Sequence, residues 1–362
     1  MYSLKRHRTT RSTMPRSPLA TAVPGAAWIE SSDWELPAHY GDPAAEYRAG
    51  RQGVVLRDTS HWSRLRFAGR DHLDFLHRMT TNHFSALAPG AGLEAVFTDN
   101  RGRILELGTF YRAGESTLAV LSPSGCEKIP AWLDRYIFAE KITIQDLTLE
   151  LAMLELLGPQ AIALVAQVLG QDLTSVADHH LLNDPLAEGI WLARLDRFGH
   201  AGLRAMGPAE QLLPLWERLS AGGGQPLGEE AWEMLRVEAG LPLQGQELGE
   251  EHNPWEANLG RTIHMNKGCY IGQEVIARLD TYDKVKQRLM GLELPEGPLP
   301  PAGTVLQAGN AEAGRLTSAV RIPGQPGGIG LAYVRRDHWQ PGTLLQFEGN
   351  PQPVRVVPLP GT

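Results

Sequence analysis

Residues 266–274 read NKGCYIGQE and gather several chemically distinctive side chains in one short stretch. Two glycines four positions apart permit backbone geometry that other residues resist. The pair Gln273–Glu274 suits the first turn of a helix. Near that helix start and Lys267, Cys269 either has a lowered thiol pKa and reacts readily, or is a small side chain buried in a tight turn. The residues alone leave both interpretations open.

Upstream of this stretch, the hydrophobic pattern predicts two successive rounds of strands and helices, because short apolar runs alternate with segments of helical period. The first round has strands at 54–58 and 63–69, a helix at 70–79, a hairpin at 94–112, a strand at 116–122, a helix at 125–137 and a strand at 141–147. The second has a strand at 149–158, a helix at 159–169, paired strands at 189–206 and helices at 208–220 and 229–240.

After residue 287 the pattern changes to short apolar runs separated by Gly and Pro clusters, which is typical of a small β-barrel. The predicted fold class is therefore α+β with a C-terminal β domain. The predicted domains are a basic disordered tail (1–25), a first α+β unit (26–147), a second α+β unit (148–286) that carries the signature segment 266–280, and a β-barrel (287–362).

Composition excludes several classes of function. The 362 residues carry a formal net charge of −7, which gives no general attraction to nucleic acid or to anionic lipid. No apolar run is long enough to span a bilayer. Two cysteines cannot form a disulfide framework or hold an iron–sulfur cluster alone, and no metal-ligand spacing occurs. These features predict an intracellular protein with reduced thiols and no metal site.

The N-terminal residues before Glu30 contain five Lys and Arg residues and no acid. Such a segment is either a disordered basic tail or an organelle transit peptide. The predicted location is accordingly the cytoplasm, with the mitochondrial matrix as the alternative.

The stretch KGCYIGQE (267–274) resembles the signature of the YgfZ-type folate-binding proteins, which are relatives of the aminomethyltransferase (T-protein) of the glycine cleavage system. Every defined position of the motif Lys-Gly-Cys-aromatic-x-Gly-Gln-Glu is present. Further stretches also resemble the family: MTTNHFSAL (79–87), LRVEAGLPLQGQEL (235–248), GRLTSAV (314–320) and GLAYVRR (330–336).

The resemblance implies a three-part, T-protein-like cloverleaf around a central cavity that binds tetrahydrofolate. It also implies a folate-dependent role in assembling or repairing iron–sulfur clusters, including those of radical enzymes that modify transfer RNA. The implied partners are a reduced folate and iron–sulfur client enzymes or assembly proteins, without direct contact to nucleic acid or membrane.

Two departures from the transferase pattern predict that aminomethyl transfer is not the main activity. The paired acids of the transferase hairpin become Glu106 and Leu107, and a carboxylate that steers proton movement is central to that reaction. In the turn RFGHAG (197–202), His200 replaces the glutamate that grips the pterin. A folate-dependent aminomethyltransferase remains the alternative function.

The resemblance assigns two groups of site residues. The catalytic candidates are Cys269 and Lys267, and the folate-binding candidates are Arg236, His200, Tyr270, Gln273, Glu274 and Arg278. For Arg236 the alternative is a helix-surface arginine paired with Glu233 or with an acid outside the helix. For His200 the alternative is a turn histidine without a ligand.

Overall fold

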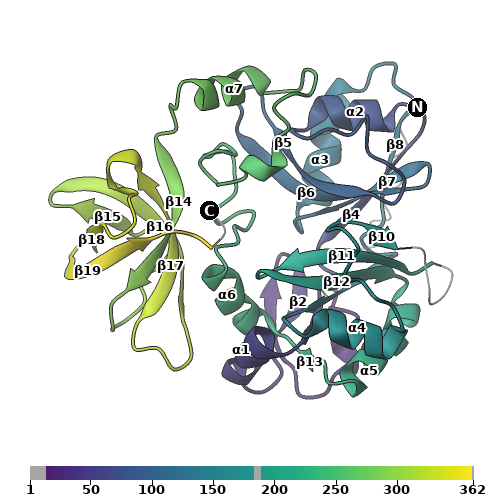
Figure 1. Cartoon of the computed structure of the whole chain (residues 1–362), viewed down its shortest axis with the longest axis horizontal. Coiled ribbons are helices and arrows are strands. Elements are labelled where there is room, and N and C mark those ends of the chain that lie inside the picture. The colour runs from purple at the N-terminus through teal and green to yellow at the C-terminus, as the bar shows by residue number, and fades with distance from the viewer. Residues whose placement is uncertain (1–13, 183–188, 361–362) are drawn as a thin grey trace. The chain divides into compact units, whose positions relative to one another are not determined.

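The computed structural model arranges its strands in two open sheets, a closed barrel and a short hairpin (Figure 1). It describes residues 14–182 and 189–360. These residues form two units. Unit 1 contains the described residues up to His77 together with His83–Glu94 and Gly108–Trp232, and unit 2 contains Arg78–Asn82, Ala95–Leu107 and the described residues from Glu233 onward.

The six-stranded sheet has the order β10-β11-β12-β9-β3-β13. Its strands are β10 (Leu181–Leu182), β11 (Trp191–Arg197), β12 (His200–Gly207), β9 (Ala152–Leu157), β3 (Val55–Asp58) and β13 (Gln225–Pro226). Strand β9 is buried at every position, since the helices α4 (Ala161–Leu169) and α5 (Ala209–Ala221) pack on this sheet. Because β3 pairs with β9, this sheet crosses the domain boundary predicted at 147/148.

The five-stranded sheet has the order β5-β6-β7-β4-β8. It contains β5 (Gly92–Thr98), β6 (Ile104–Ala113), β7 (Ser116–Leu121), β4 (Ser63–Ala68) and β8 (Thr143–Asp146). The chain also forms α2 (His72–Met79), α3 (Gly125–Leu133) and the short helix η2 (Asp134–Tyr136). The predicted alternation of strands and helices is thus confirmed in both rounds. Continuous apolar runs form strands that are buried at every position, such as β7 and β9, and apolar stripes bury one face of the helices.

The N-terminal region departs from the prediction. A hairpin of β1 (Ala27–Ser31) and β2 (Trp34–His39) precedes helix α1 (Pro43–Gln52), and the sequence pattern predicted neither. Residues 1–13 of the predicted tail lie outside the described residues. In the rest of it, the 3-10 helix η1 (Ala20–Ala22) follows the fully buried Leu19, whose N–H donates to Asp58 at 2.8 Å. The prediction of a tail to residue 25 is therefore wrong for this packed part.

The C-terminal strands close into a barrel of order β14-β17-β16-β15-β18-β19, as the pattern predicted (Figure 1). The strands are β14 (Gln287–Leu294), β15 (Val305–Ala308), β16 (Ala311–Arg321), β17 (Gly328–Arg335), β18 (Leu344–Phe347) and β19 (Asn350–Val357), with the short helix η4 (Arg336–His338) after β17. Buried and exposed positions alternate along much of β16, which is how a small barrel fills its interior.

The segment before the barrel carries α6 (Glu229–Glu238), η3 (Gly260–Thr262) and α7 (Gln273–Thr281). Helix α6 ends at Glu238, and Gly240 just beyond it is the stop that the sequence predicted. Gly240 has φ +68°, its N–H donates to the Val237 carbonyl, and the Leu241 N–H donates to the Arg236 carbonyl. This pair of bonds is a Schellman motif. In the described part of the chain, no helix is long and apolar enough to cross a membrane.

Candidate functional site

The signature segment is fixed by hydrogen bonds to other parts of unit 2. The Ile271 N–H donates to the Arg78 carbonyl at 3.3 Å, and the Thr98 hydroxyl donates to the Ile271 carbonyl at 2.6 Å. Upstream, the His264 N–H donates to the Thr81 carbonyl at 3.0 Å. The backbone is therefore held on both sides of Cys269.

Gly272 explains why the second glycine of the motif is needed. Its φ is +85°, and a Cβ at this position would lie 2.5 Å from the Asp99 carbonyl oxygen. A side chain would be strained by both the backbone conformation and the contact. Helix α7 begins at the next residue, Gln273, so the helix start predicted here is confirmed.

Lys267 is buried, with its side chain committed to another segment of the unit. Its Nζ donates to the carbonyl oxygens of Thr80 at 2.6 Å and of Asn82 at 2.7 Å. It also lies 4.8 Å from the centre of the Tyr270 ring, a cation–π distance. Burial lowers the pKa of Lys267 to about 7. The geometry thus shows a buried amine that fixes residues 80–82, whereas a catalytic role for Lys267 remains a prediction.

Cys269 is exposed, although the neighbouring Lys267 and Tyr270 are buried. The backbone bonds and the two buried neighbours anchor the segment while the thiol faces solvent. Cys126 differs, because it is half-buried and burial raises the pKa of its thiol. The interpretation of Cys269 as a small buried side chain is therefore wrong.

Three of the predicted folate residues, Tyr270, Glu274 and Arg278, have structural partners within or beside the signature. Tyr270 packs with Ile263 and Ile276, and burial raises its pKa to about 12. Glu274 and Arg278 form an ion pair of 2.9 Å on the exposed face of α7, with side chains 85% and 62% exposed. Such a surface pair contributes little to stability, so both side chains are free to exchange partners.

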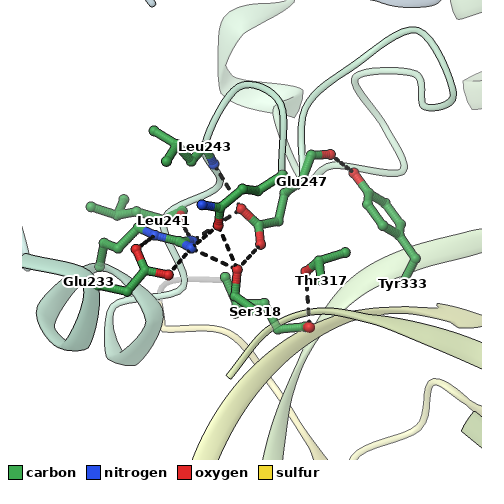
Figure 2. Close-up of polar contacts among 10 residues, drawn as sticks. Glu233, Leu241, Leu243, Glu247, Thr317, Ser318 and Tyr333 are labelled. Atoms are coloured by element: carbon green, nitrogen blue, oxygen red, sulfur yellow. Dashed lines mark hydrogen bonds and ion pairs between the residues drawn. The ribbon is translucent and has the colours of Figure 1, made fainter. Parts of the chain in front are cut away.

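Arg236 lies in a buried polar network. Figure 2 shows this network with its members Glu233, Glu247 and Ser318 labelled. Its side chain is 1% exposed and forms ion pairs with Glu233 and Glu247. The guanidinium also donates to the Leu241 carbonyl at 3.2 Å, the Ser318 hydroxyl at 2.7 Å and the Gln246 side chain.

The network attaches the barrel strands β16 and β17 to α6 and the loop that follows it. Glu247 has a fully buried carboxylate, which also accepts from the Ser318 hydroxyl at 2.6 Å and the Leu243 N–H at 3.0 Å. The Tyr333 hydroxyl donates to the Glu247 carbonyl at 2.8 Å (Figure 2). Arg236 is thus paired with acids, as its alternative interpretation states, yet it is buried rather than at the helix surface.

A pocket of about 1310 Å³ lies directly against this network, entirely within unit 2. Glu233, Gln246 and Ser318 line it, and all three are hydrogen-bonded to Arg236. Its volume exceeds that of typical ligand sites, about 300–1,000 Å³. Among the described residues, the lining includes none of Tyr270, Gln273, Glu274 and Arg278.

Two stacked rings form one wall of the pocket. His252 and Tyr333 have ring centres 3.5 Å apart and planes inclined by 11°. Burial, reinforced by the charge of Arg103, lowers the pKa of His252 to about 4, so the imidazole is neutral at neutral pH. Gln287 lies 3.2 Å from Nδ1 of this ring, where its amide can donate to the neutral form.

Four exposed basic side chains that line the pocket were not among the predicted site residues. Lys284, Lys286, Arg315 and Arg335 line it and are exposed. The sequence signal for them was weak, because the stretches DKVKQR (283–288), GRLTSAV (314–320) and YVRR (333–336) are separated along the chain and only the fold gathers them.

The first departure from the transferase pattern, Glu106 and Leu107, lies in β6, and the second, His200, lies in β12. Glu106 is fully buried in β6, and Leu107 packs against an apolar cluster that includes Val96 and Leu248. His200 begins β12 and pairs with Arg197 across the hairpin in unit 1, half-buried. Among the described residues, no group of three or more His, Cys, Asp or Glu side chains could hold a metal ion.

Two open sheets with their helices, followed by a closed six-stranded barrel, define a T-protein-like fold. A crystal structure of the glycine cleavage system aminomethyltransferase T from Bartonella henselae has this fold, with a TM-score of 0.85 over 96% of this chain and 98% of that chain at 22% identity. Residues 20–267 match the GCVT N-terminal domain, and residues 286–359 match the CAF17 C-terminal β-barrel domain.

Sequence relatives agree with these domain matches. An aminomethyltransferase of Rubrobacter xylanophilus is 32% identical over 355 residues, which cover 97% of this chain and 95% of that protein. A chloroplastic protein of Arabidopsis thaliana that carries the name "putative transferase" is 36% identical over 290 residues, which cover 78% of this chain and 66% of that protein. The chain therefore belongs to the GCVT-domain family, with a CAF17-type barrel and with aminomethyltransferases among its relatives.

Proposed function

We propose that this chain is a YgfZ-type, tetrahydrofolate-dependent accessory protein that supports the assembly or repair of iron–sulfur enzymes. The observation that carries the proposal is the exposed Cys269 in a segment fixed on both sides of the thiol. A thiol that only fills space is normally buried. An exposed thiol on a fixed backbone is suited to bind or exchange a soft metal or sulfur species of a partner.

The residues of the unit 2 pocket fit a reduced folate. Its volume of about 1310 Å³ accommodates an elongated ligand, and the His252–Tyr333 stack gives it an aromatic wall. Glu233 supplies a carboxylate that can accept paired N–H groups, as a pteridine ring presents them. When bound, a reduced folate carries one-carbon groups on its N5 and N10 nitrogens. Folate-binding roles for Arg236, His200, Tyr270, Gln273, Glu274 and Arg278 stay proposals of their own, since none of the six is among the described residues that line this pocket.

A folate-dependent aminomethyltransferase is the second candidate, because relatives with that name match nearly the whole chain. The surroundings of Leu107 argue against it. Leu107 packs with apolar side chains where the transferase pattern has an acid, and a carboxylate there would be costly to bury. Glu106 and Leu107 are successive residues of a strand, so their side chains point to opposite faces.

A titration with two readouts separates the candidates. The purified protein is titrated with tetrahydrofolate, and its melting temperature is followed, since a ligand that binds only the folded state raises it. Aminomethyl transfer from a lipoyl-bound donor is then assayed against a true T-protein. We expect a thermal shift with little or no turnover. Turnover at the T-protein rate would establish the second candidate, and no shift at millimolar folate would remove the folate claim.

We also propose that the protein is located in the cytoplasm. Fusion of residues 1–25 to a fluorescent protein, followed by imaging, tests the organellar alternative.

A further inference from the structure

The exposed Cys269 lies midway between two anchors of the signature segment, all within unit 2. Two residues before it, the Lys267 side chain donates to backbone carbonyls of the segment 78–82. Two residues after it, the Ile271 N–H donates to the same segment at 3.3 Å, and the Ile271 carbonyl accepts from the Thr98 hydroxyl at 2.6 Å. The position of the thiol therefore depends on what holds these two anchors.

Both anchors rest on one platform, which consists of residues 78–82 and the end of strand β5. The Thr81 N–H donates to the Val96 carbonyl at 3.0 Å, and the Thr81 hydroxyl accepts from the Val96 N–H at 3.0 Å. Thr81 and Thr98, the last residue of β5, are both fully buried. Water consequently does not compete for these two hydroxyl groups, and the platform is held together by its own hydrogen bonds.

The turn that follows Thr98 packs against the start of α7. The Asp99 carboxylate accepts from two backbone N–H groups of this turn, each at 2.8 Å. A Cβ on Gly272 would lie 3.0 Å from the Gly102 Cα, and a Cβ on Gly102 would lie 3.1 Å from Cγ1 of Ile276. The two backbones thus approach each other through glycines. Since this turn is closed and in contact with α7, the Thr98 hydroxyl has a fixed place beside the signature segment.

We propose that Thr98 is a positioning residue, whose hydroxyl fixes the Ile271 carbonyl and thereby aligns the Cys269 thiol with the soft metal or sulfur species that a partner protein brings to it. This inference rests on the proposed function of Cys269 and adds a residue outside the signature. A small reagent needs only access to the thiol, whereas a partner needs the thiol at a fixed place. Loss of the Thr98 hydroxyl should therefore affect the two reactions differently.

The test compares Thr98→Val, which keeps the branched shape without the hydroxyl, with Thr98→Ser, which keeps the hydroxyl. Each full chain is expressed in a strain defective in iron–sulfur enzyme maintenance, and its Cys269 is alkylated with iodoacetamide after purification. We expect Thr98→Val to be alkylated within about threefold of the unchanged rate. It should restore less than about a tenth of the enzyme activity that the unchanged chain restores, because the thiol is misplaced for the partner. Thr98→Ser should restore most of that activity.

The matched control is Thr59→Val in unit 1, where a fully buried hydroxyl lies 3.4 Å from the Met153 carbonyl. This variant should complement fully. Melting temperatures of both valine variants separate a misplaced thiol from a lost fold. If Thr98→Val does not fold, Gly102→Ala, which presses a Cβ against α7, replaces it with the same expected result.

Three outcomes would overturn the inference and leave the role of Cys269 standing: full complementation by the folded Thr98→Val, failure of Thr98→Ser, or failure of the Thr59→Val control. The last of these would show that loss of any buried threonine hydroxyl is sufficient. Failure of the unchanged chain to complement would overturn the inference together with the proposed function.

Discussion

At the scale of single residues, the two cysteines of the chain serve as each other's control. Cys269 is exposed, whereas Cys126 is half-buried with a raised thiol pKa. We expect iodoacetamide at neutral pH to modify Cys269 at least about tenfold faster than Cys126, since the accessible thiolate is the reacting species. Mass spectrometry of timed digests measures both rates in one sample. Equal rates would show that the segment does not present the thiol.

Arg236 gives a second prediction at this scale. Arg236→Leu leaves the buried carboxylate of Glu247 without its cation, which should lower the free energy of unfolding by about 3–5 kcal/mol. The control Arg278→Leu removes an exposed ion pair and should change it by less than about 0.5 kcal/mol. Urea denaturation measures both. A loss at Arg236 as small as that at Arg278 would contradict the structural role of the network.

At the scale of elements, the start of α7 depends on one glycine. Gly272→Ala forces a side chain into a left-handed conformation and against the Asp99 carbonyl. It should therefore lower the free energy of unfolding by at least about 2 kcal/mol. Gly249→Ala, in the same unit, has no atom within 4 Å of the added Cβ and should cost less than about 0.5 kcal/mol. Thermal or urea unfolding measures the stability of both variants. Similar losses in the free energy of unfolding would contradict the role of Gly272 at the start of α7.

The burial of His252 should make stability depend on pH. The pKa of folded His252 is about 4, below the ordinary 6.5, so the unfolded chain binds more protons between these values. Stability is then fully present above pH 6.5 and falls by on the order of 3 kcal/mol toward pH 4. His252→Phe keeps a ring beside Tyr333 without a titrating group and should lose less over this range. Parallel stability curves for the two proteins would contradict this account.

Elements with a strong hydrophobic period could be predicted from the sequence, and those without one could not. Strand β1 has no alternating buried face, and its turn to β2 uses Ser32 and Asp33 at positive φ, where Asn-Gly is the usual signal. Helix α1 did have a signal, because Asp42 caps it and Pro43 opens it.

At the scale of the whole molecule, the signature motif predicted a glycine-dependent helix start, but the partners of its side chains come from distant segments. Lys267 contacts carbonyls 187 and 185 residues away, and Arg236 reaches Ser318 82 residues away. Tertiary contacts of this separation leave no local pattern in one sequence. The pocket and the basic side chains that line it were missed for the same reason.

The central claim concerns the molecule in its cell: Cys269 is the functional thiol of a folate-dependent accessory protein. Complementation of a strain defective in iron–sulfur enzyme maintenance tests it most directly, with the unchanged chain, Cys269→Ala and Cys126→Ala expressed at equal levels. We predict that Cys269→Ala folds and binds tetrahydrofolate as the unchanged chain does but fails to complement, while Cys126→Ala complements. Full complementation by Cys269→Ala would contradict the claim.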